Sequence, residues 1–346
     1  MGGVAVWAVS AAVLVLSACG GRAATTLDPV PAAVACGGAI GPGAIVLRSD
    51  LASGRLHAQG EQLFLVETGG RVLRIDRCTG DAVELTTGLS SVSSSAVTGE
   101  HVWVLGANAD QARRLVRVPT SGASVDAVAV ERSATQLVTD GTTLYFLARP
   151  DSSNVEVLSL ADPSTEPLPF ASIQSSASYG LRLLDASAAG LYFSQDCDCA
   201  PSLQWLPHGA TGLSLLEGAG PVGVWGNYAV ELDVDRLYVG VNTWSGGSGI
   251  QRLPLEGGEP EQVVSAGSGW STELEANMKA LCWVQGRPDA PRAVRCNTLS
   301  DTTQPPRQMD QVDSSLPISL VVSTDALYWL RPANAGANYE LVAAAL

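Results

Sequence analysis

The chain has 346 residues, of which 46% are hydrophobic and 16% charged, so it has ample material for a folded core. Its formal net charge is −14, from 20 basic and 34 acidic residues, with no basic run. Because nucleic acid is bound through clustered Lys and Arg side chains, we do not expect it as a partner. We attribute the diffuse acidic surface to solubility; weak binding of divalent cations or basic ligands is the alternative.

The N-terminus has the features of an export signal. Residues 4–18 are apolar or small, which is shorter than the roughly 20 residues of a membrane-spanning helix and typical of a signal peptide. The run ends in Leu16-Ser17-Ala18-Cys19-Gly20, which resembles the bacterial lipobox. The resemblance implies removal of residues 1–18, a lipid on Cys19, and attachment outside the cytoplasm to the cell envelope by this anchor alone. Met1-Gly2-Gly3 lacks Lys and Arg, which points to a start further upstream or to inefficient translocation. An ordinary secretory signal with an incidental cysteine is the alternative.

Two further segments precede the repeated part of the chain. Residues 19–43 are rich in Gly, Ala and Pro and lack periodicity, which predicts a tether. Residues 44–51 then form an isolated strand pattern. We assign residues 44–346 to a single domain.

A short unit recurs seven times along this domain. Its clearest copy is Asp325-Ala326-Leu327-Tyr328-Trp329-Leu330, and successive copies lie 39 to 47 residues apart. The copies centre on Leu63-Phe64, Val102-Trp103, Leu144-Tyr145, Leu191-Tyr192, Leu237-Tyr238, Leu281-Cys282 and Leu327-Tyr328. Self-similarity with a period of about 40–50 residues indicates blades, arrays or solenoids.

Each copy belongs to a group of four short strands bounded by Gly, Pro, Asp and Ser. In the second repeat we expect strands at 94–97, 101–105, 114–118 and 125–130. Four-stranded units at this period form the blades of a β-propeller. The last repeat lacks a fourth strand, so residues 44–51 are predicted to complete it and remove the open edge. The prediction is an all-β, seven-bladed propeller of antiparallel blades; only residues 273–279 carry a pattern compatible with a helix.

The repeats also resemble a known group of propellers. The Asp-x-Leu-Tyr-Trp segment at 325–329 and the Ile-x-Arg-Leu-Pro-Leu-x-Gly-Gly segment at 250–258 are similar to repeats of YWTD, NHL and TolB-type propellers. This resemblance covers residues 44–346 and implies the fold. Such propellers mostly bind proteins, peptides or glycans, and a few are lyases or cyclases.

Six cysteines remain of the seven when Cys19 is assigned to the lipid, an even number in an exported chain. Cys282 and Cys296 are predicted to lie opposite each other on adjacent strands, within bridging distance. Cys36 and Cys78 are predicted on the same rim of neighbouring blades, where a bond would staple the ring closure.

The remaining pair, Cys197 and Cys199, has three interpretations. We favour a structural bridge over a soft-metal or redox site and over free thiols. A calcium site at Asp151, Asp196 and Asp198 is disfavoured because no Asp-x-Asp-x-Asp-Gly loop is present. The three histidines, His57, His101 and His208, lie in three different repeats, so we expect no zinc site, no other metal and no cofactor.

The tryptophans suggest a binding surface. Three of them lie on second strands and are expected in the blade cores: Trp103, Trp283 and Trp329. Trp225, Trp244 and Trp270 are predicted in links on one rim, with Asn242, Arg149 and Asp196 as polar neighbours. Aromatic side chains anchor interfaces, although these rings could instead cap the blade cores.

No catalytic motif is present, so we expect non-catalytic binding or scaffolding at the cell envelope. The ligand would be a protein, a peptide or a glycan, and the protein itself a monomer. The alternative is a lyase- or cyclase-type enzyme that uses the central channel. A cluster of Glu, Asp and His around the channel mouth would favour the enzyme, whereas a broad apolar rim would favour the binder.

Overall fold

A computed structural model describes most of the repeated domain. The described residues are 36, 43–85, 87–122, 126–129, 134–149, 154–161, 167–174, 180–195, 202–216, 230–233, 235–242, 247–268, 270–286, 291–300, 304–312, 318–333 and 338–346. The chain contacts separate Met1–Ala32 from Ala33–Leu346, and all described residues lie in the second unit.

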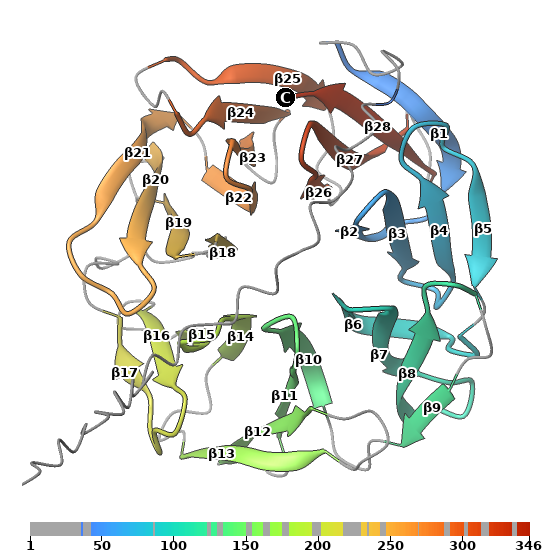
Figure 1. The fold of residues 1–346 in the computed structure, drawn as a ribbon, viewed down its shortest axis with the longest axis vertical. Coiled ribbons are helices and arrows are strands. Elements are labelled where there is room, and N and C mark those ends of the chain that lie inside the picture. Colours follow the sequence, from blue (N-terminus) through green and yellow to red (C-terminus); the bar gives the residue numbers. More distant parts are fainter. Residues whose placement is uncertain are drawn as a thin grey trace, which may run out of the picture. The chain divides into compact units, whose positions relative to one another are not determined.

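The described strands form seven antiparallel four-stranded sheets arranged in a ring, as Figure 1 shows. The seven-bladed β-propeller predicted from the repeats is confirmed, and no helix occurs in the described part of the chain. The segment 273–279, whose sequence is compatible with a helix, is not helical. Strand β22 continues to Ala276, and the following turn leads directly into β23.

The strands of the first three blades follow one another along the chain. Blade 1 contains β2 (Gly54–Gln59), β3 (Gln62–Glu67), β4 (Val72–Asp76) and β5 (Ala82–Leu85). Blade 2 contains β6 (Ser91–Thr98), β7 (His101–Ala107), β8 (Arg113–Pro119) and β9 (Asp126–Ala129). Blade 3 contains β10 (Ala134–Thr139), β11 (Leu144–Ala148), β12 (Asn154–Leu160) and β13 (Leu168–Gln174).

The next three blades repeat this order, and the seventh differs. Blade 4 contains β14 (Leu181–Ala186), β15 (Gly190–Gln195), β16 (Ser202–Pro207) and β17 (Ser214–Leu215). Blade 5 contains β18 (Val230–Asp233), β19 (Arg236–Asn242), β20 (Gly247–Pro254) and β21 (Glu261–Ser268). Blade 6 contains β22 (Trp270–Ala276), β23 (Ala280–Gly286), β24 (Arg292–Thr298) and β25 (Arg307–Val312). Blade 7 contains β26 (Ser319–Val322), β27 (Ala326–Pro332), β28 (Tyr339–Ala345) and β1 (Ile45–Leu51).

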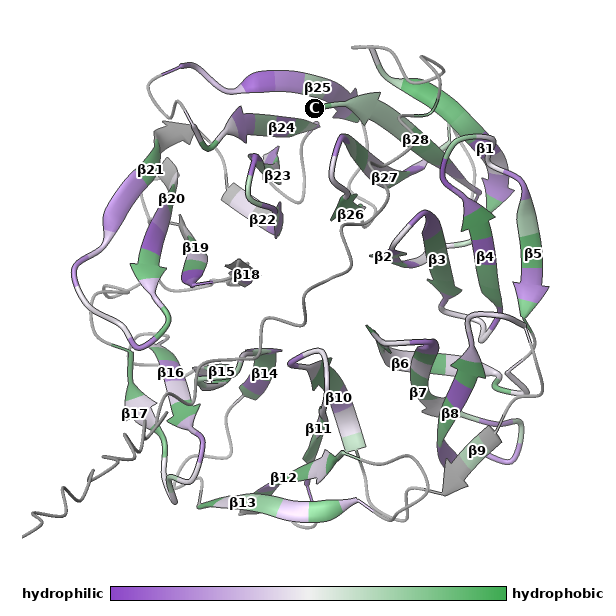
Figure 2. Ribbon diagram, viewed as in Figure 1, coloured by the Kyte–Doolittle hydropathy of each residue, from purple (hydrophilic) through white to green (hydrophobic). Residues whose placement is uncertain are grey.

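The hydrophobic core lies between the blades. One cluster joins Trp103 and Leu105 of blade 2 to Phe146 and Leu158 of blade 3. The second strands are covered on both faces by neighbouring blades, which is why they read as continuous apolar runs. The three strand tryptophans predicted in the cores are buried as expected: Trp103, Trp283 and Trp329. Strands that are covered and strands that are exposed differ in hydropathy, as Figure 2 shows. Strand β28, which lies between β1 and β27 in its sheet, is largely hydrophobic, whereas β25, the outer edge strand of blade 6, is largely hydrophilic.

Ring closure follows the prediction that the first strand completes the last blade. Strand β1 pairs with β28 in antiparallel register, with Ile45 opposite Ala343 and Leu51 opposite Tyr339. The turn after β4 also contacts β1, because the Arg48 guanidinium donates to the Gly80 carbonyl at 3.3 Å. Gly80 has φ +77, and a side chain there would collide with the β1 backbone, so this close approach requires glycine.

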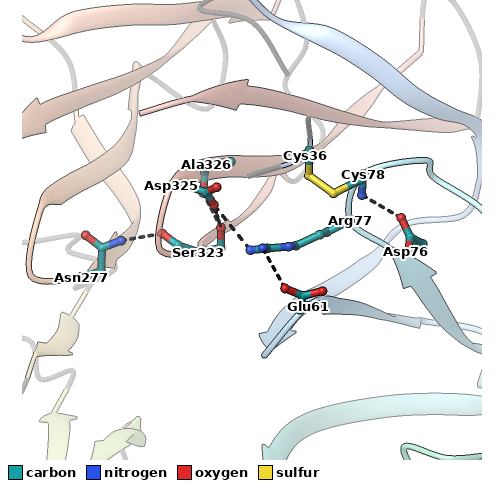
Figure 3. Close-up of polar contacts among 9 residues, drawn as sticks. All are labelled: Cys36, Glu61, Asp76, Arg77, Cys78, Asn277, Ser323, Asp325 and Ala326. Atoms are coloured by element: carbon teal, nitrogen blue, oxygen red, sulfur yellow. Dashed lines mark hydrogen bonds and ion pairs between the residues drawn. A yellow bond between two sulfur atoms is a disulfide. The ribbon is translucent and has the colours of Figure 1, made fainter. Parts of the chain in front are cut away.

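A covalent bond and an ion cluster reinforce this junction, which we call the closure seam (Figure 3). Cys36 is bonded to Cys78, and the second predicted pair, Cys282 with Cys296, is also formed. Beside Cys78, the buried Arg77 guanidinium lies 3.6 Å from a Glu61 carboxylate oxygen in blade 1 and 3.4 Å from an Asp325 carboxylate oxygen in blade 7. One cation therefore joins the first and last blades.

Blade 6 replaces an aromatic ring by its disulfide. In the other six blades the second residue of the repeat centre is Phe64, Trp103, Tyr145, Tyr192, Tyr238 or Tyr328. Cys282 occupies this position in blade 6 and lies opposite Cys296 in the β23–β24 ladder. Both cysteines are buried, so the bond fills core volume that a ring fills elsewhere.

Candidate functional site: the central channel

The innermost strands of the seven blades surround a cavity of about 630 Å³. These strands are β2, β6, β10, β14, β18, β22 and β26, and Figure 1 shows them nearest the centre of the ring. Each is a sheet edge that faces the channel, so its side chains are not required to be apolar. The cavity is lined by both charged and apolar residues, which makes it the candidate functional site.

The strand register places one residue from each blade at a common level. These residues pair with the second residue of each repeat centre, and we call them the carboxylate level. They are His57, Ala96, Val138, Asp185, Glu231, Glu275 and Val321. The level is therefore charged over blades 4, 5 and 6 and apolar over blades 2, 3 and 7. We call Asp185, Glu231 and Glu275 the acidic arc.

A β-bulge adds a fourth carboxylate next to the acidic arc. The register of β22 shifts between Thr272 and Leu274, which leaves Glu273 as the extra residue. Glu273 has φ +48, an uncommon value for a residue other than glycine, and its exposed side chain lines the cavity. Bulges redirect side chains and are frequent beside functional sites, so this one directs a carboxylate into the channel.

Side chains of the inner strands also connect neighbouring blades, and most of these connections are uncharged. The Ser94 hydroxyl accepts a hydrogen bond from Leu137 N–H at 3.1 Å, and Gln136 Oε1 accepts one from Leu183 N–H at 2.8 Å. At the closing junction, the Ser319 hydroxyl accepts a bond from Leu56 N–H at 3.0 Å. Each bond satisfies a backbone donor at the inner edge of the next blade.

In the acidic arc, carboxyl groups of the carboxylate level connect neighbouring blades in the same way. Glu231 of blade 5 accepts a hydrogen bond from the Ala276 N–H of blade 6, and Glu275 accepts one from the Val322 N–H of blade 7. Asp185 accepts a bond from Ala186 N–H at 2.8 Å within its own strand. The carboxylates are thus held in place by backbone donors rather than left mobile.

The surrounding blades remove much of the water from these carboxylates and raise their pKa values. Burial raises the pKa of Asp185 to about 7 and that of Glu275 to about 8. Burial, together with the charges of Glu275 and Asp185, raises the pKa of Glu231 well above its usual range. Burial within the ring also raises the pKa of Glu273, although its side chain remains accessible from the channel. Ionisation of the cluster is therefore opposed both by desolvation and by like charge.

Arg55 is the cation that the acidic residues share. Its exposed side chain lines the cavity from blade 1, and its charge lowers the pKa of all four carboxyl groups against the larger effect of burial. Arg182 of β14 also lines the cavity. With every group ionised, four carboxylates face two guanidinium groups, so the cavity has a net negative charge.

His57 and Ser95 make a contact that resembles a nucleophile and its base. His57 Nε2 lies 2.8 Å from the Ser95 hydroxyl across the junction of blades 1 and 2. However, burial and the nearby Arg55 charge lower the pKa of His57 to about 3, which makes it a weak base. The Ser95 side chain is also buried. We therefore assign the contact to the series of hydrogen bonds between blades.

The predicted rim residues are only partly within the described structure. Trp270 was predicted in a link, and this was wrong, since it begins strand β22. Asn242 ends β19, and Arg149 follows β11 and donates from Nη2 to the Leu181 carbonyl at 3.2 Å. These positions share the rim where second strands end and inner strands begin. The other residues singled out in the sequence lie outside the described residues: Cys19, Cys197, Cys199, Trp225, Trp244, Asp151, Asp196 and Asp198.

The acidic arc was missed in the sequence, although a local signal marks it. Each member is a single acid between apolar residues, in Leu184-Asp185-Ala186, Val230-Glu231-Leu232 and Leu274-Glu275-Ala276. His57 occupies the same context in Leu56-His57-Ala58. Aligning the repeats on the second residue of each repeat centre would have brought these four positions together.

Two searches of the described residues gave negative results. No group of three or more His, Cys, Asp or Glu side chains there has an arrangement that could hold a metal ion. No helix among the same residues is long and apolar enough to cross a membrane.

No protein-family model matches the chain, and no curated protein matches it. Several solved structures do. U3-55K has a TM-score of 0.60 at 12% identity, covering 88% of this chain and 100% of its own. YCF48 bound to D1 peptide has a TM-score of 0.57 at 14% identity, covering 88% and 97%.

Peptidases match through part of their length. A chain from a structural analysis of two prolyl endopeptidases has a TM-score of 0.53 at 12% identity, covering 80% of this chain and 46% of that chain. A Mycobacterium tuberculosis puromycin-hydrolyzing peptidase has a TM-score of 0.53 at 16% identity, covering 82% and 50%. The chain thus spans about half the length of these enzymes. All these similarities show the β-propeller fold alone.

Proposed function

We propose that the protein is a non-catalytic binding or scaffolding lipoprotein of the cell envelope, held by a lipid on Cys19. Its ligand is a segment of a protein or peptide, with a glycan as the other class, and it enters the channel mouth. The observation that carries this proposal is the two-sided cavity, with the acidic arc on one side and Ala96, Val138 and Val321 on the other.

The cavity wall favours a segment that carries a basic group. Carboxylates fixed by backbone N–H groups pair with an ammonium or guanidinium group without first having to be ordered. The apolar side of the same level can contact the aliphatic part of a Lys or Arg side chain. YCF48, a propeller of similar fold, was solved with a bound peptide, which supports a peptide as the first class to test.

The rim extends the proposed surface beyond the channel. Trp270, Asn242 and Arg149 occupy the rim where inner strands begin, so a segment that enters from this side passes them. Trp225 and Trp244 lie outside the described residues and remain candidates from the sequence alone.

Crosslinking followed by pull-down from native envelope membranes tests the binding proposal. The full chain should capture one or more defined partners, and Glu231→Gln combined with Glu275→Gln should reduce their capture at least tenfold. Glu259→Gln, which removes an exposed carboxylate in blade 5, should leave capture unchanged and serves as the matched control. Equal capture by both variants would contradict a role for the channel.

The lipid anchor is tested separately. Palmitate should label the wild-type chain and should fail to label Cys19→Ala, which should also leave the membrane fraction. Labelling that persists in this variant would refute lipidation at Cys19.

A lyase- or cyclase-type enzyme is the second candidate function. The observation in its favour is the cluster of Glu, Asp and His side chains in the channel, which is the feature expected above to favour an enzyme. Raised carboxyl pKa values near neutrality also suit general acid–base catalysis. Mass spectrometry of small molecules and glycans after incubation with the protein separates the two functions. Turnover by the wild type that Glu275→Gln abolishes would establish an enzyme, whereas unchanged ligand recovered in stoichiometric amounts would establish a binder.

A further inference from the structure

At two junctions of the acidic arc the groups that connect neighbouring blades are carboxyl groups, which can gain or lose a proton. Neutral side chains connect blades 2 to 3, 3 to 4 and 7 to 1. Glu231 and Glu275 connect blades 5 to 6 and 6 to 7. The same backbone donors could have been satisfied by Ser or Gln, as they are elsewhere in the ring, so the ionisable groups confer a property that the neutral ones lack.

We propose that the acidic arc is a proton-controlled contact between blades, which sets both the charge of the channel wall and the cohesion of blades 4 to 7. This inference concerns the regulation of the channel site and in that respect rests on the proposed function, whereas its structural part does not require a ligand. In the protonated state the arc is neutral and the blades hold together. In the ionised state it carries adjacent like charges and presents an anionic wall to the channel.

The groups that face the arc define its response. Strand β2 provides Arg55 and His57, β14 provides Arg182 with Asp185, β18 provides Glu231, and β22 provides Glu273 with Glu275. The described residues of β6, β10 and β26 that line the cavity carry no charge. Arg55 can compensate one carboxylate at a time, so a second and third ionisation on the same level meet increasing repulsion.

The direction of the effect follows from the proton balance. In the unfolded chain Asp and Glu ionise near pH 4, whereas burial raises the pKa of Asp185 to about 7 and that of Glu275 to about 8 in the folded protein. Between the unfolded pKa near 4 and the folded pKa of each group, the folded state therefore holds more protons than the unfolded state, and the stability of the fold falls as the pH rises through this range. His57, with its pKa lowered to about 3, acts in the opposite direction only below about pH 6.5. The window from pH 7 to 9 isolates the carboxyl groups.

A ligand that brings a cation into the channel changes this balance. A positive charge beside the arc favours the ionised carboxylates, so binding releases protons and becomes tighter as the pH rises toward 8. The same wall binds such a ligand weakly in a mildly acidic compartment. The lipid-anchored location proposed above would expose the channel to such changes of external pH.

Thermal unfolding of the full chain, without any ligand, tests the contact. The wild-type melting temperature should fall by several degrees between pH 7 and pH 9. Glu231→Gln combined with Glu275→Gln should lose at least half of this decrease, whereas Glu259→Gln should retain it. A wild type with constant melting temperature over this range, or a double variant that follows the wild-type curve, would overturn the inference.

A measurement on the wild type covers the case in which the double variant does not fold. In ¹³C carboxyl NMR of the native protein, at least two Asp or Glu side chains should titrate above pH 6. If every carboxyl group titrates below pH 5, the proposed contact does not exist. Because neither experiment uses a ligand, failure of the binding proposal leaves this inference standing, and the reverse also holds.

Discussion

The closure seam and the acidic arc are both junctions between blades, but opposite electrostatic arrangements build them. At the seam, buried Arg77 lies between Glu61 and Asp325, and the Cys36–Cys78 bond lies beside it. At the arc, Glu231 and Glu275 lie on one level with Asp185 and share the charge of Arg55. The seam combines attraction with a covalent bond, whereas the arc combines repulsion with desolvation.

This difference shows where the ring needs stability and where it can forgo it. The seam joins the two ends of the domain, because β1, which leads directly into blade 1, is held in blade 7 by its pairing with β28 rather than by a chain connection, so any opening of the ring would begin there. The arc lies within three consecutive blades that the chain already connects. Repulsion is tolerated at the arc because opening there would not separate the ends, and unfavourable carboxylate clusters are characteristic of functional sites.

The largest effect is expected from removing the covalent part of the seam. Replacing Cys36 and Cys78 by Ser frees a loop of 42 residues, for which the chain-entropy model gives a loss of about 4 kcal/mol. Chemical denaturation of the two proteins under oxidising conditions measures this difference. An unchanged midpoint would show that β1–β28 pairing alone closes the ring.

A smaller loss is expected from removing the buried cation of the seam. Arg77→Ala leaves Asp325 and Glu61 without their partner and should destabilise the protein by about 2 kcal/mol. The control is Arg252→Ala, which breaks the more exposed pair with Glu261 and should cost less than about 1 kcal/mol. Equal losses in the two variants would refute the special role of Arg77.

In contrast to the substitutions at the seam, a substitution in the acidic arc is expected to stabilise the protein. Asp185→Asn removes a carboxyl group whose pKa burial raises to about 7, so the variant should be more stable than the wild type at pH 9 by about 1 kcal/mol. At pH 3, where Asp185 is protonated in both the folded and the unfolded chain, the difference should vanish. Urea denaturation at the two pH values gives the comparison, and a variant destabilised equally at both would contradict repulsion in the arc.

The smallest effect is expected from the shared cation. Arg55→Gln removes the charge that partly offsets burial, so the pKa values of the carboxyl groups should rise further. The pH at which the decrease in melting temperature levels off should then be higher in the variant than in the wild type by a few tenths of a unit. Arg236→Gln, at the start of β19 with a largely exposed partner, should leave the profile unchanged.

The comparison also separates what could be predicted from what could not. The period of the repeat predicted seven blades, and the missing fourth strand of the last repeat predicted that β1 closes the ring, as it does. Bridging geometry between adjacent strands predicted Cys282 with Cys296, and the bond is formed. Residues 273–279 looked compatible with a helix because the bulge at Glu273 interrupts the polar–apolar alternation of strand β22, which nevertheless stays paired with β23.

The site was harder to predict than the fold. Asp185, Glu231 and Glu275 are 44 to 90 residues apart, and each looks like an ordinary polar residue on a half-exposed strand. They lie at one level because they occupy equivalent register positions in three blades that surround a common axis. The sequence pointed instead to tryptophans on the rim, because a single aromatic residue in a predicted loop stands out without knowledge of its neighbours in space.

By itself, the sequence determined the number of blades, the order of their strands and the way the ends meet. These properties depend on local periodicity and on a repeat that each unit carries within itself. Only the tertiary structure decided that three separated acids form one wall of the channel and that a buried arginine links the first blade to the last. Such groupings depend on the angle at which blades pack around the axis, and they join residues whose energies are coupled through space rather than along the chain.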